Sequence, residues 1–230
     1  MVLGKKMNKT LEFMSKKFGV DVEKDPVVRL TQINRTIIAQ LFAELGFTEG
    51  AEIGVAQGAY SKVLFEHIPQ LRLYGIDVWQ NYPGYNELEN PSALKEEAYE
   101  TLKSFNSFLL EKFSMDAVTY FDDNSLDFVF IDGAHDFKNV ACDISEWSKK
   151  VKPGGIVFGH DYKFHKEYMQ RYRNGPPRKR FAVDVKLVVD AYRDAKGIRP
   201  WFEIYPEIPD PTFGRDNPCW MFVRQEGDTL

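Results

Sequence analysis

The sequence has few cysteines, and they form no recognisable pattern. Cys142 and Cys219 are the two cysteines in 230 residues, and no Cys-x-x-Cys spacing is present. This argues against a disulfide framework or a cysteine zinc site, and two isolated thiols are typical of a reducing compartment. No apolar stretch approaches the roughly 20 residues of a membrane-spanning helix, and Met1 is followed by no signal-peptide pattern. We therefore expect a cytoplasmic protein without a membrane partner.

An excess of positive charge is also missing. The formal net charge is −4, which argues against general nucleic-acid binding because phosphate backbones attract a positive field. Hydrophobic residues make up 43% and charged residues 28%, as in ordinary globular proteins. The chain has no repeats and no low-complexity linker, so we expect a single domain over residues 1–230 that begins with an extension over residues 1–30.

Short apolar runs alternate with helical stretches along the chain. Predicted strands cover residues 51–55, 72–78, 108–113, 127–132, 156–159, 201–205 and 219–223. Predicted helices cover residues 33–45, 61–68, 91–104, 138–150 and 181–196. The alternation predicts a parallel sheet, but no helix separates the last two strands, which should form an antiparallel hairpin. The expected fold is α/β and Rossmann-like, with a seven-stranded, mostly parallel sheet, one antiparallel strand and helices on both faces.

The turn after the first predicted strand differs from phosphate-binding loops. Gly54 and Gly58 give a GxxxG spacing, and Ala56 replaces the middle glycine of the dinucleotide-binding GxGxxG. The Gly-Lys-Ser/Thr ending of a P-loop is absent as well. The turn therefore predicts close approach to a ligand other than a pyrophosphate, with a purely structural turn as the alternative.

Polar residues follow each of the next four strands. Asp77 comes 23 residues after Gly54, a spacing typical of a carboxylate that accepts ribose hydroxyls, in NAD-binding proteins too. The residues after the later strands are Ser114, Met115 and Asp116, then Asp132, Gly133, Ala134 and His135, then Gly159, His160, Asp161 and Tyr162. Because ligands bind at the carboxyl ends of parallel strands, we expect one ligand site along this edge.

Two further residues near these strand ends allow two interpretations each. Glu52 is an acid within an apolar strand, and its burial is costly without a partner. That partner is either a cationic ligand or a structural group such as a lysine or a backbone amide. Trp79 packs either against a ligand or in the core.

Three segments of the sequence resemble a known family. They are AEIGVAQGAYS, YGIDVW and, most specifically, the run over residues 125–162 that contains IDGAH and GHDY. These segments resemble class I S-adenosylmethionine-dependent methyltransferases of the methyltransferase-24 type, which are similar to catechol O-methyltransferase and to macrocin-type O-methyltransferases. The resemblance covers residues 48–162. It implies methyl transfer from S-adenosylmethionine to a hydroxyl of a small molecule or sugar.

The resemblance also implies roles for individual residues. The methionine portion of the cofactor would be surrounded by Glu52, Gly54, Gly58 and Ser61. Asp77 would hold the ribose, and Ser114 with Met115 would flank the adenine. The further predicted cofactor-binding residues are Val55, Val78, Trp79 and Asp132. In metal-dependent relatives a divalent ion is bound after the fourth and fifth strands, at the positions of Asp132, His160 and Asp161. Since His160 replaces a carboxylate of the relatives, the ion would be Mg²⁺, a softer metal or none.

The resemblance to catechol O-methyltransferase places the general base at His135, three residues after Asp132, which is the second predicted catalytic residue. Imidazole titrates near neutrality, as such a base requires. The structural alternatives are an N-cap role for Asp132 and a hydrogen-bonded structural histidine. Residues 162–180 are basic and aromatic, which predicts a lid over an anionic acceptor; a solvated loop is the alternative.

Other classes of protein remain as rivals. The missing GxGxxG disfavours an NAD-dependent or nucleotide-sugar enzyme, and the negative charge disfavours an RNA methyltransferase. A catalytically silent binding module would have no need for Asp77, Asp132, His135 and Asp161 together. The acceptor and the oligomeric state, a homo-oligomer included, stay open.

Overall fold

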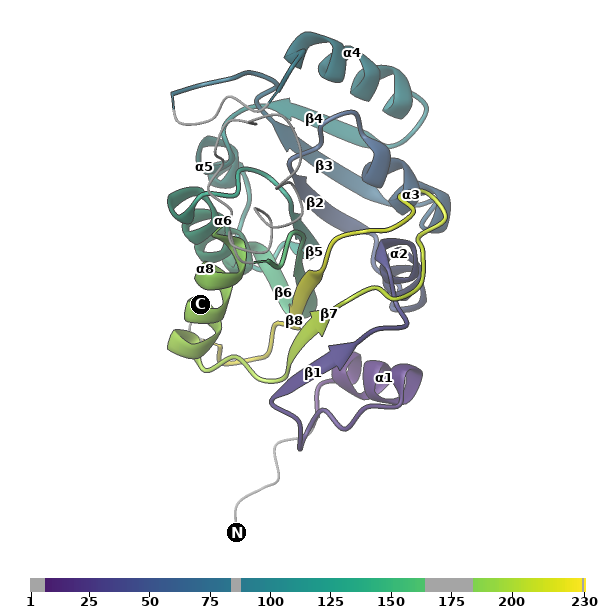
Figure 1. Cartoon of the computed structure of the whole chain (residues 1–230), viewed down its shortest axis with the longest axis vertical. Coiled ribbons are helices and arrows are strands. Elements are labelled where there is room, and N and C mark those ends of the chain that lie inside the picture. The colour runs from purple at the N-terminus through teal and green to yellow at the C-terminus, as the bar shows by residue number, and fades with distance from the viewer. Residues whose placement is uncertain (1–6, 84–87, 164–183, 229) are drawn as a thin grey trace, which may run out of the picture.

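A single mixed sheet forms the centre of the molecule. The computed structural model describes residues 7–83, 88–163, 184–228 and 230. Eight strands lie in the order β1-β7-β8-β6-β5-β2-β3-β4 (Figure 1). They are β1 (Val27–Leu30), β2 (Glu49–Ile53), β3 (Arg72–Asp77), β4 (Ser107–Glu111), β5 (Leu126–Ile131), β6 (Val151–Gly159), β7 (Trp201–Ile204) and β8 (Cys219–Val223). β8 pairs antiparallel with both β6 and β7, and the other neighbouring strands are parallel.

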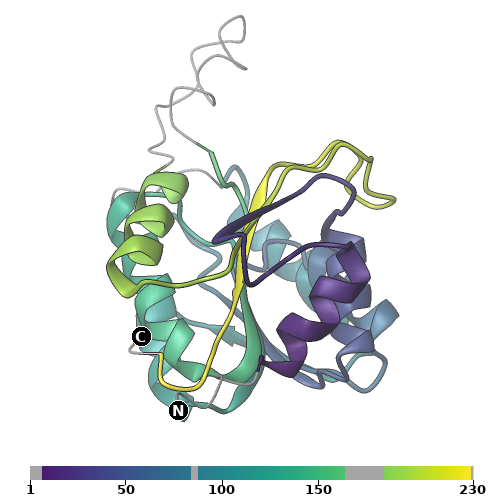
Figure 2. The ribbon, with the colours of Figure 1, turned by 90° about the horizontal axis from the view of Figure 1, so that it is seen from below.

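Helices cover both faces of this sheet. They are α1 (Lys9–Phe18), α2 (Arg35–Glu44), α3 (Ala59–His67), α4 (Pro91–Leu102), α5 (Ser114–Ala117), α6 (Phe137–Lys150) and α8 (Val185–Lys196), with a 3₁₀ turn η1 at Val118–Tyr120. Seen along the sheet, α6 and α8 lie on one face and α1 and α2 on the other (Figure 2). None of the described helices is long and apolar enough to cross a membrane.

Successive side chains of the central strands pack into two separate hydrophobic cores, one on each face of the sheet. On β5, Phe128 and Phe130 pack with α2 and α3, whereas Val129 and Ile131 pack with α6. Both sets are buried because successive residues of a strand point to opposite faces, and both faces carry helices. This explains why the run from Leu126 to Ile131 is almost continuously apolar.

The predicted fold class is confirmed, with two differences in the strands. The sheet has eight strands rather than seven, because Val27–Leu30, within the expected extension, forms an edge strand parallel to β7. α1 of the same segment packs Leu11 and Met14 into the core. In addition, β6 begins at Val151 rather than at residue 156, and its register against β5 shifts between Leu126 and Phe128.

The strand order reverses beside β2. The chain passes from β2 to β3 and β4 on one side, and then returns to β5 and β6 on the other. In open α/β sheets, such a reversal opens a crevice at the carboxyl ends of the strands. Gly54 follows β2 at φ +90°, and a Cβ there would lie 2.1 Å from the carbonyl oxygen of Asp132. The turns after β2 and β5 therefore touch, and only glycine fits between them.

Candidate active site

A cavity of about 510 Å³ opens at this reversal of the strand order. The predicted cofactor residues that line it are Glu52, Gly54, Val55, Asp77, Val78, Ser114, Met115 and Asp132. Gly58, Ser61 and Trp79 do not line it. The strand ends thus meet at one cavity, and the role of each residue toward a cofactor stays a prediction.

Glu52 is buried at the base of the cavity, where it is 2% exposed. Burial raises the pKa of Glu52 to about 8, although the Ser61 hydroxyl donates a short hydrogen bond that opposes the rise. Ser61 therefore acts on the cavity through Glu52 rather than by lining it. Since a protonated acid tolerates burial and a cation favours the carboxylate, a positively charged ligand would ionise this side chain.

Asp77 fixes the turn that carries the glycines. Its Oδ2 accepts hydrogen bonds of 2.9 Å from the backbone N–H groups of Val55 and Ala56, and its Oδ1 accepts one of 2.8 Å from Trp79. Asp77 is therefore a hydrogen-bonded part of the turn rather than a solvated acid at the end of the strand. Trp79 is 4% exposed, and its Nε1 donates to the Ala56 carbonyl at 2.7 Å, as expected of a core aromatic.

Asp143 is a cavity residue that the sequence analysis missed. The Ser114 hydroxyl donates to Asp143 Oδ1 at 2.5 Å and accepts from Trp147 Nε1 at 2.7 Å. Burial raises the pKa of Asp143 to about 7, against the effect of that hydrogen bond. The available signal is helical spacing, because position 143 shares the apolar face of α6 with Val140 and Trp147.

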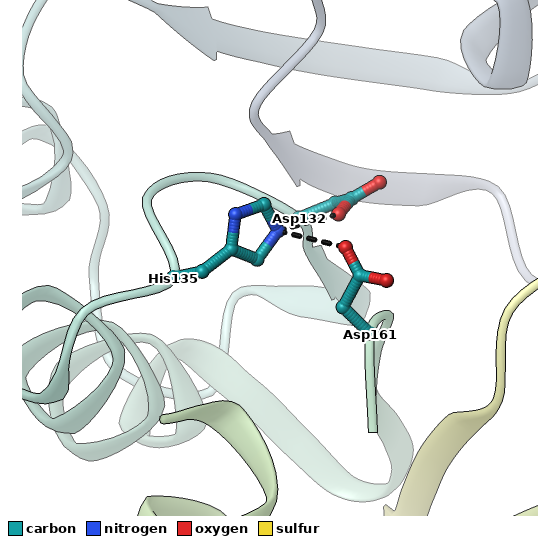
Figure 3. Close-up of side chains that lie close together, drawn as sticks. All are labelled: Asp132, His135 and Asp161. Carbon is teal, nitrogen blue, oxygen red and sulfur yellow. Dashed lines mark ion pairs between the residues drawn. The ribbon is translucent and has the colours of Figure 1, made fainter. Parts of the chain in front are cut away.

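Two carboxylates and an imidazole lie close together, as Figure 3 shows. Asp132 follows β5, His135 lies in the loop before α6, and Asp161 follows β6. His135 Nε2 lies 3.0 Å from Asp161 Oδ2 and 3.6 Å from Asp132 Oδ1. One ligand atom from each residue lies within 4.8 Å of the others, a spacing that could hold a metal ion. Asp132 also lines the cavity, so the cluster and the cavity share a wall.

The carboxylates control the protonation of His135. Burial disfavours the imidazolium, but Asp132 and Asp161 outweigh it and raise the pKa of His135 to about 10. Yet among the described residues the buried Nε2 has no partner with hydrogen-bond geometry. In this state the ring holds its proton at neutral pH and cannot accept another, which opposes the predicted role as general base.

His160 lies beside the cluster and is held mainly by a different acid. Its Nε2 is 3.0 Å from Asp216 Oδ1, whereas its Nδ1 is 3.4 Å from Asp132 Oδ1 and 3.7 Å from Asp161 Oδ2. Burial opposes the charge, but Asp132 raises the pKa of His160 well above its ordinary value. The metal-compatible group therefore contains His135 rather than His160, and the predicted ligand role of His160 stays untested.

Asp132 does not cap the helix that follows it. The N-cap of α6 is Asp136, which accepts hydrogen bonds from the backbone N–H groups of Lys138 and Asn139. The capping alternative for Asp132 is therefore wrong, and its side chain faces the cavity and the histidines instead.

The start of the expected lid is part of the fold. Tyr162 is 1% exposed, and its hydroxyl can donate its one proton to either Asp190 Oδ1 at 2.5 Å or Glu203 Oε1 at 2.9 Å. Lys163 is also buried and pairs with Asp161 at 2.9 Å. The rest of the predicted basic segment, residues 164–180, lies outside the described residues.

Two solved structures that have a similar fold contain an S-adenosyl ligand. An O-methyltransferase from Bacillus cereus in complex with SAH shares 14% identity and a TM-score of 0.56, over 97% of this chain and 94% of that chain. The O-methyltransferase TomG from Streptomyces achromogenes, in complex with SAM, shares 16% identity and a TM-score of 0.55, over 97% and 92%. The fold is that of the class I S-adenosylmethionine-dependent methyltransferases.

The sequence comparison gives the family. Residues 51–162 match the family model described as a methyltransferase domain. This match confirms the predicted resemblance to a methyltransferase family over these residues. The chain is also 29% identical, over 94 residues, to the uncharacterized protein y4gI of Sinorhizobium fredii. That match covers 38% of this chain and 10% of the length of the relative.

Proposed function

We propose that the protein is an S-adenosylmethionine-dependent O-methyltransferase that acts on a hydroxyl of a small molecule or sugar. The observation that carries this proposal is the shared wall between the cavity and the cluster of Asp132, His135 and Asp161. A cofactor in the cavity would have its methionine end next to groups that can hold an acceptor oxygen. The O-methyltransferase descriptions of the solved relatives support the same chemistry.

The chain's own residues would bind and align the reactants. S-adenosylmethionine supplies an activated methyl group on a sulfonium, so the protein mainly orients an oxygen and handles one proton. Asp77 already accepts three backbone hydrogen bonds, and its remaining lone pair, on Oδ1, would accept a ribose hydroxyl. Glu52 and Asp132 place negative charge opposite the cationic methionine end. Met115 gives the nucleobase end an apolar wall.

The cluster also fits a divalent cation, held by Asp132, His135 and Asp161. Two carboxylates and an imidazole are donors typical of transition ions, which tolerate nitrogen better than Mg²⁺ does. The buried Nε2 of His135, without a hydrogen bond among the described residues, is a donor suited to coordination. When bound, such an ion would lower the pKa of an acceptor hydroxyl. A cation bound by Asp132 and Asp161 would displace the proton of His135 and leave Nε2 free to coordinate it, so we assign His135 to the ion rather than to general-base catalysis.

Calorimetric titration tests the proposed cofactor. We expect the purified chain to bind one equivalent of S-adenosylhomocysteine and to give no heat with NADH. NADH is the matched control, because a ribose-binding Asp77 alone suits both ligands. Binding of NADH without S-adenosylhomocysteine would replace this proposal with the rival enzyme class.

Metal titration of the wild type and of His135→Ala tests the ion separately. We expect the wild type to bind Mn²⁺ and the variant to lose that binding, while both keep their affinity for S-adenosylhomocysteine. If the variant binds Mn²⁺ like the wild type, His135 is not a ligand. Chelation followed by metal add-back then shows whether methyl transfer requires the ion.

A further inference from the structure

Arg35 is a buried cation in the cavity that lies outside the matched family segment. It opens α2, and its Nε and Nη2 donate to Asp216 Oδ2 and Oδ1 at 2.6 and 3.0 Å. Its guanidinium carbon lies 3.6 Å from the ring centroid of Phe213 and 5.4 Å from that of Tyr60. The aromatic contacts and the bidentate ion pair hold the guanidinium in one orientation.

One edge of this guanidinium is not engaged by the protein. Among the described residues, Arg35 Nη1 has no hydrogen-bond partner, although the side chain is only 10% exposed. The residue lines the cavity. A buried guanidinium donor forms strong hydrogen bonds with a planar anion, so this edge suits a carboxylate.

A chain of contacts connects Arg35 to Asp132 in the cavity wall. Asp216, which holds Arg35, lies 3.0 Å from His160 Nε2, and His160 Nδ1 lies 3.4 Å from Asp132 Oδ1. Among the influences on the pKa of Glu52, the charge of Arg35 acts against burial, and Asp132 in turn raises the pKa of Arg35. The other cationic side chains of the lining differ in position. Lys112 lies over the ring of Tyr120, and Lys138 belongs to the first turn of α6. An anionic group near Glu52 and Asp132 would therefore find its counter-charge on Arg35.

We infer that Arg35 binds the α-carboxylate of the methionine portion of the cofactor. This inference rests on the proposed function. The methionine end carries an ammonium group and a carboxylate about two bonds apart, and the acids Glu52 and Asp132 suit the first but repel the second. Arg35 completes the site as the cation for the second. Because Asp216 holds both Arg35 and His160, this contact also connects cofactor binding to the histidine cluster.

The test removes the carboxylate from the ligand and the guanidinium from the protein in turn. S-adenosylhomocysteine and its decarboxylated analogue are titrated calorimetrically into the wild type and into Arg35→Met. We expect the wild type to bind S-adenosylhomocysteine about 10- to 100-fold more tightly than the analogue. Arg35→Met should bind the two ligands about equally. Arg29→Met, which removes an arginine paired with Glu203 on the edge strand β1, is the control and should keep the wild-type ratio.

A purely structural role for Arg35 gives a different result. Loss of packing would lower the affinity for both ligands by the same factor and leave the ratio of the two affinities at its wild-type value. That outcome would overturn the inference. An unchanged ratio together with unchanged affinities would also overturn it, since the cofactor carboxylate would then bind elsewhere. If Arg35→Met does not fold, Arg35→Met/Asp216→Asn removes the ion pair as a unit and carries the same test. Failure of the wild type to bind S-adenosylhomocysteine would instead overturn the proposed function.

Discussion

The two ends of the cavity are assembled in different ways. At the ribose end, Asp77 accepts hydrogen bonds from the backbone N–H groups of Val55 and Ala56, which are 22 and 21 residues away in the sequence. These residues lie at the ends of the adjacent strands β2 and β3. At the opposite end, Arg35 and Asp216 meet across 181 residues of sequence. The first end is thus encoded in one βαβ segment, whereas the second depends on bringing the two ends of the chain together.

The loop between β7 and β8 accounts for that second end. Asp210 accepts hydrogen bonds from the backbone N–H and the hydroxyl of Thr36 at 2.9 and 3.1 Å. Further along the loop, Asn217 donates to Asp161 Oδ1 at 2.8 Å. The loop therefore positions both Arg35 and a member of the proposed metal cluster. Changes in this loop should alter chemistry without touching the segments that resemble the family.

The largest effect is expected at the opposite end, from Asp161→Asn. Loss of one carboxylate from the proposed ion site should lower methyl transfer by about 10²- to 10⁴-fold, a range typical of lost acid–base or ligand groups. The affinity for S-adenosylhomocysteine should stay unchanged, because Asp161 does not line the cavity. Release of S-adenosylhomocysteine with an acceptor found by screening measures the first effect. Unimpaired transfer would remove Asp161 from the site.

Glu52→Gln should have opposite effects on cofactor binding and on the stability of the fold. We expect S-adenosylmethionine to bind about tenfold or more weakly, because a buried opposite charge is lost. The pKa of Glu52 is about 8 in the fold and 4.5 ordinarily, so the folded state keeps a proton that the unfolded state releases. Wild-type stability should therefore fall as pH rises from about 4.5 to about 8.

Thermal unfolding of Glu52→Gln at pH 5 and pH 8 measures that effect. Glutamine keeps an acceptor for Ser61 but does not ionise, so the variant should gain melting temperature relative to the wild type mainly at pH 8. A gain of equal size at both pH values would show that ionisation of Glu52 is not the cause.

A matched pair of substitutions compares the two ends directly. Asp77 and Asp210 each accept several backbone hydrogen bonds, so Asp77→Ala and Asp210→Ala should each destabilise the fold by about 2–4 kcal/mol. Only Asp77→Ala should also weaken binding of the decarboxylated analogue of S-adenosylhomocysteine, by about tenfold, because this ligand keeps the ribose contacts but has no carboxylate for Arg35. Denaturant unfolding and calorimetry measure the two quantities. Equal loss of affinity in both variants would contradict the division between the ends.

The smallest effect is expected from Trp79→Phe. Phenylalanine keeps most of the buried surface but loses the hydrogen bond from Nε1 to Ala56, at a cost of about 1 kcal/mol. Affinity for S-adenosylhomocysteine should be unchanged in calorimetry, since Trp79 does not line the cavity. A clear loss of affinity with stability preserved would restore the predicted ligand contact.

What the sequence predicts well is what local pattern encodes. The alternation of apolar runs with helical stretches predicted seven of the eight strands, β2 to β8. The strand ends predicted in this way include Asp77 and Asp132, which line the cavity. The edge strand β1 was missed because four residues that alternate between exposed and buried give little signal. Arg35 follows the N-cap Asn34 and has the sequence context of a solvated helix start. Its partner Asp216 is too distant for any spacing argument to find.

A crystal structure of the complex with S-adenosylhomocysteine tests the central claim most directly. The account predicts the adenosyl group at the carboxyl ends of β2 and β3, with a ribose hydroxyl on Asp77 and its sulfur at the Asp132 wall. A ligand bound outside this cavity, or inside it with the nucleoside at the Arg35 end, would contradict the account.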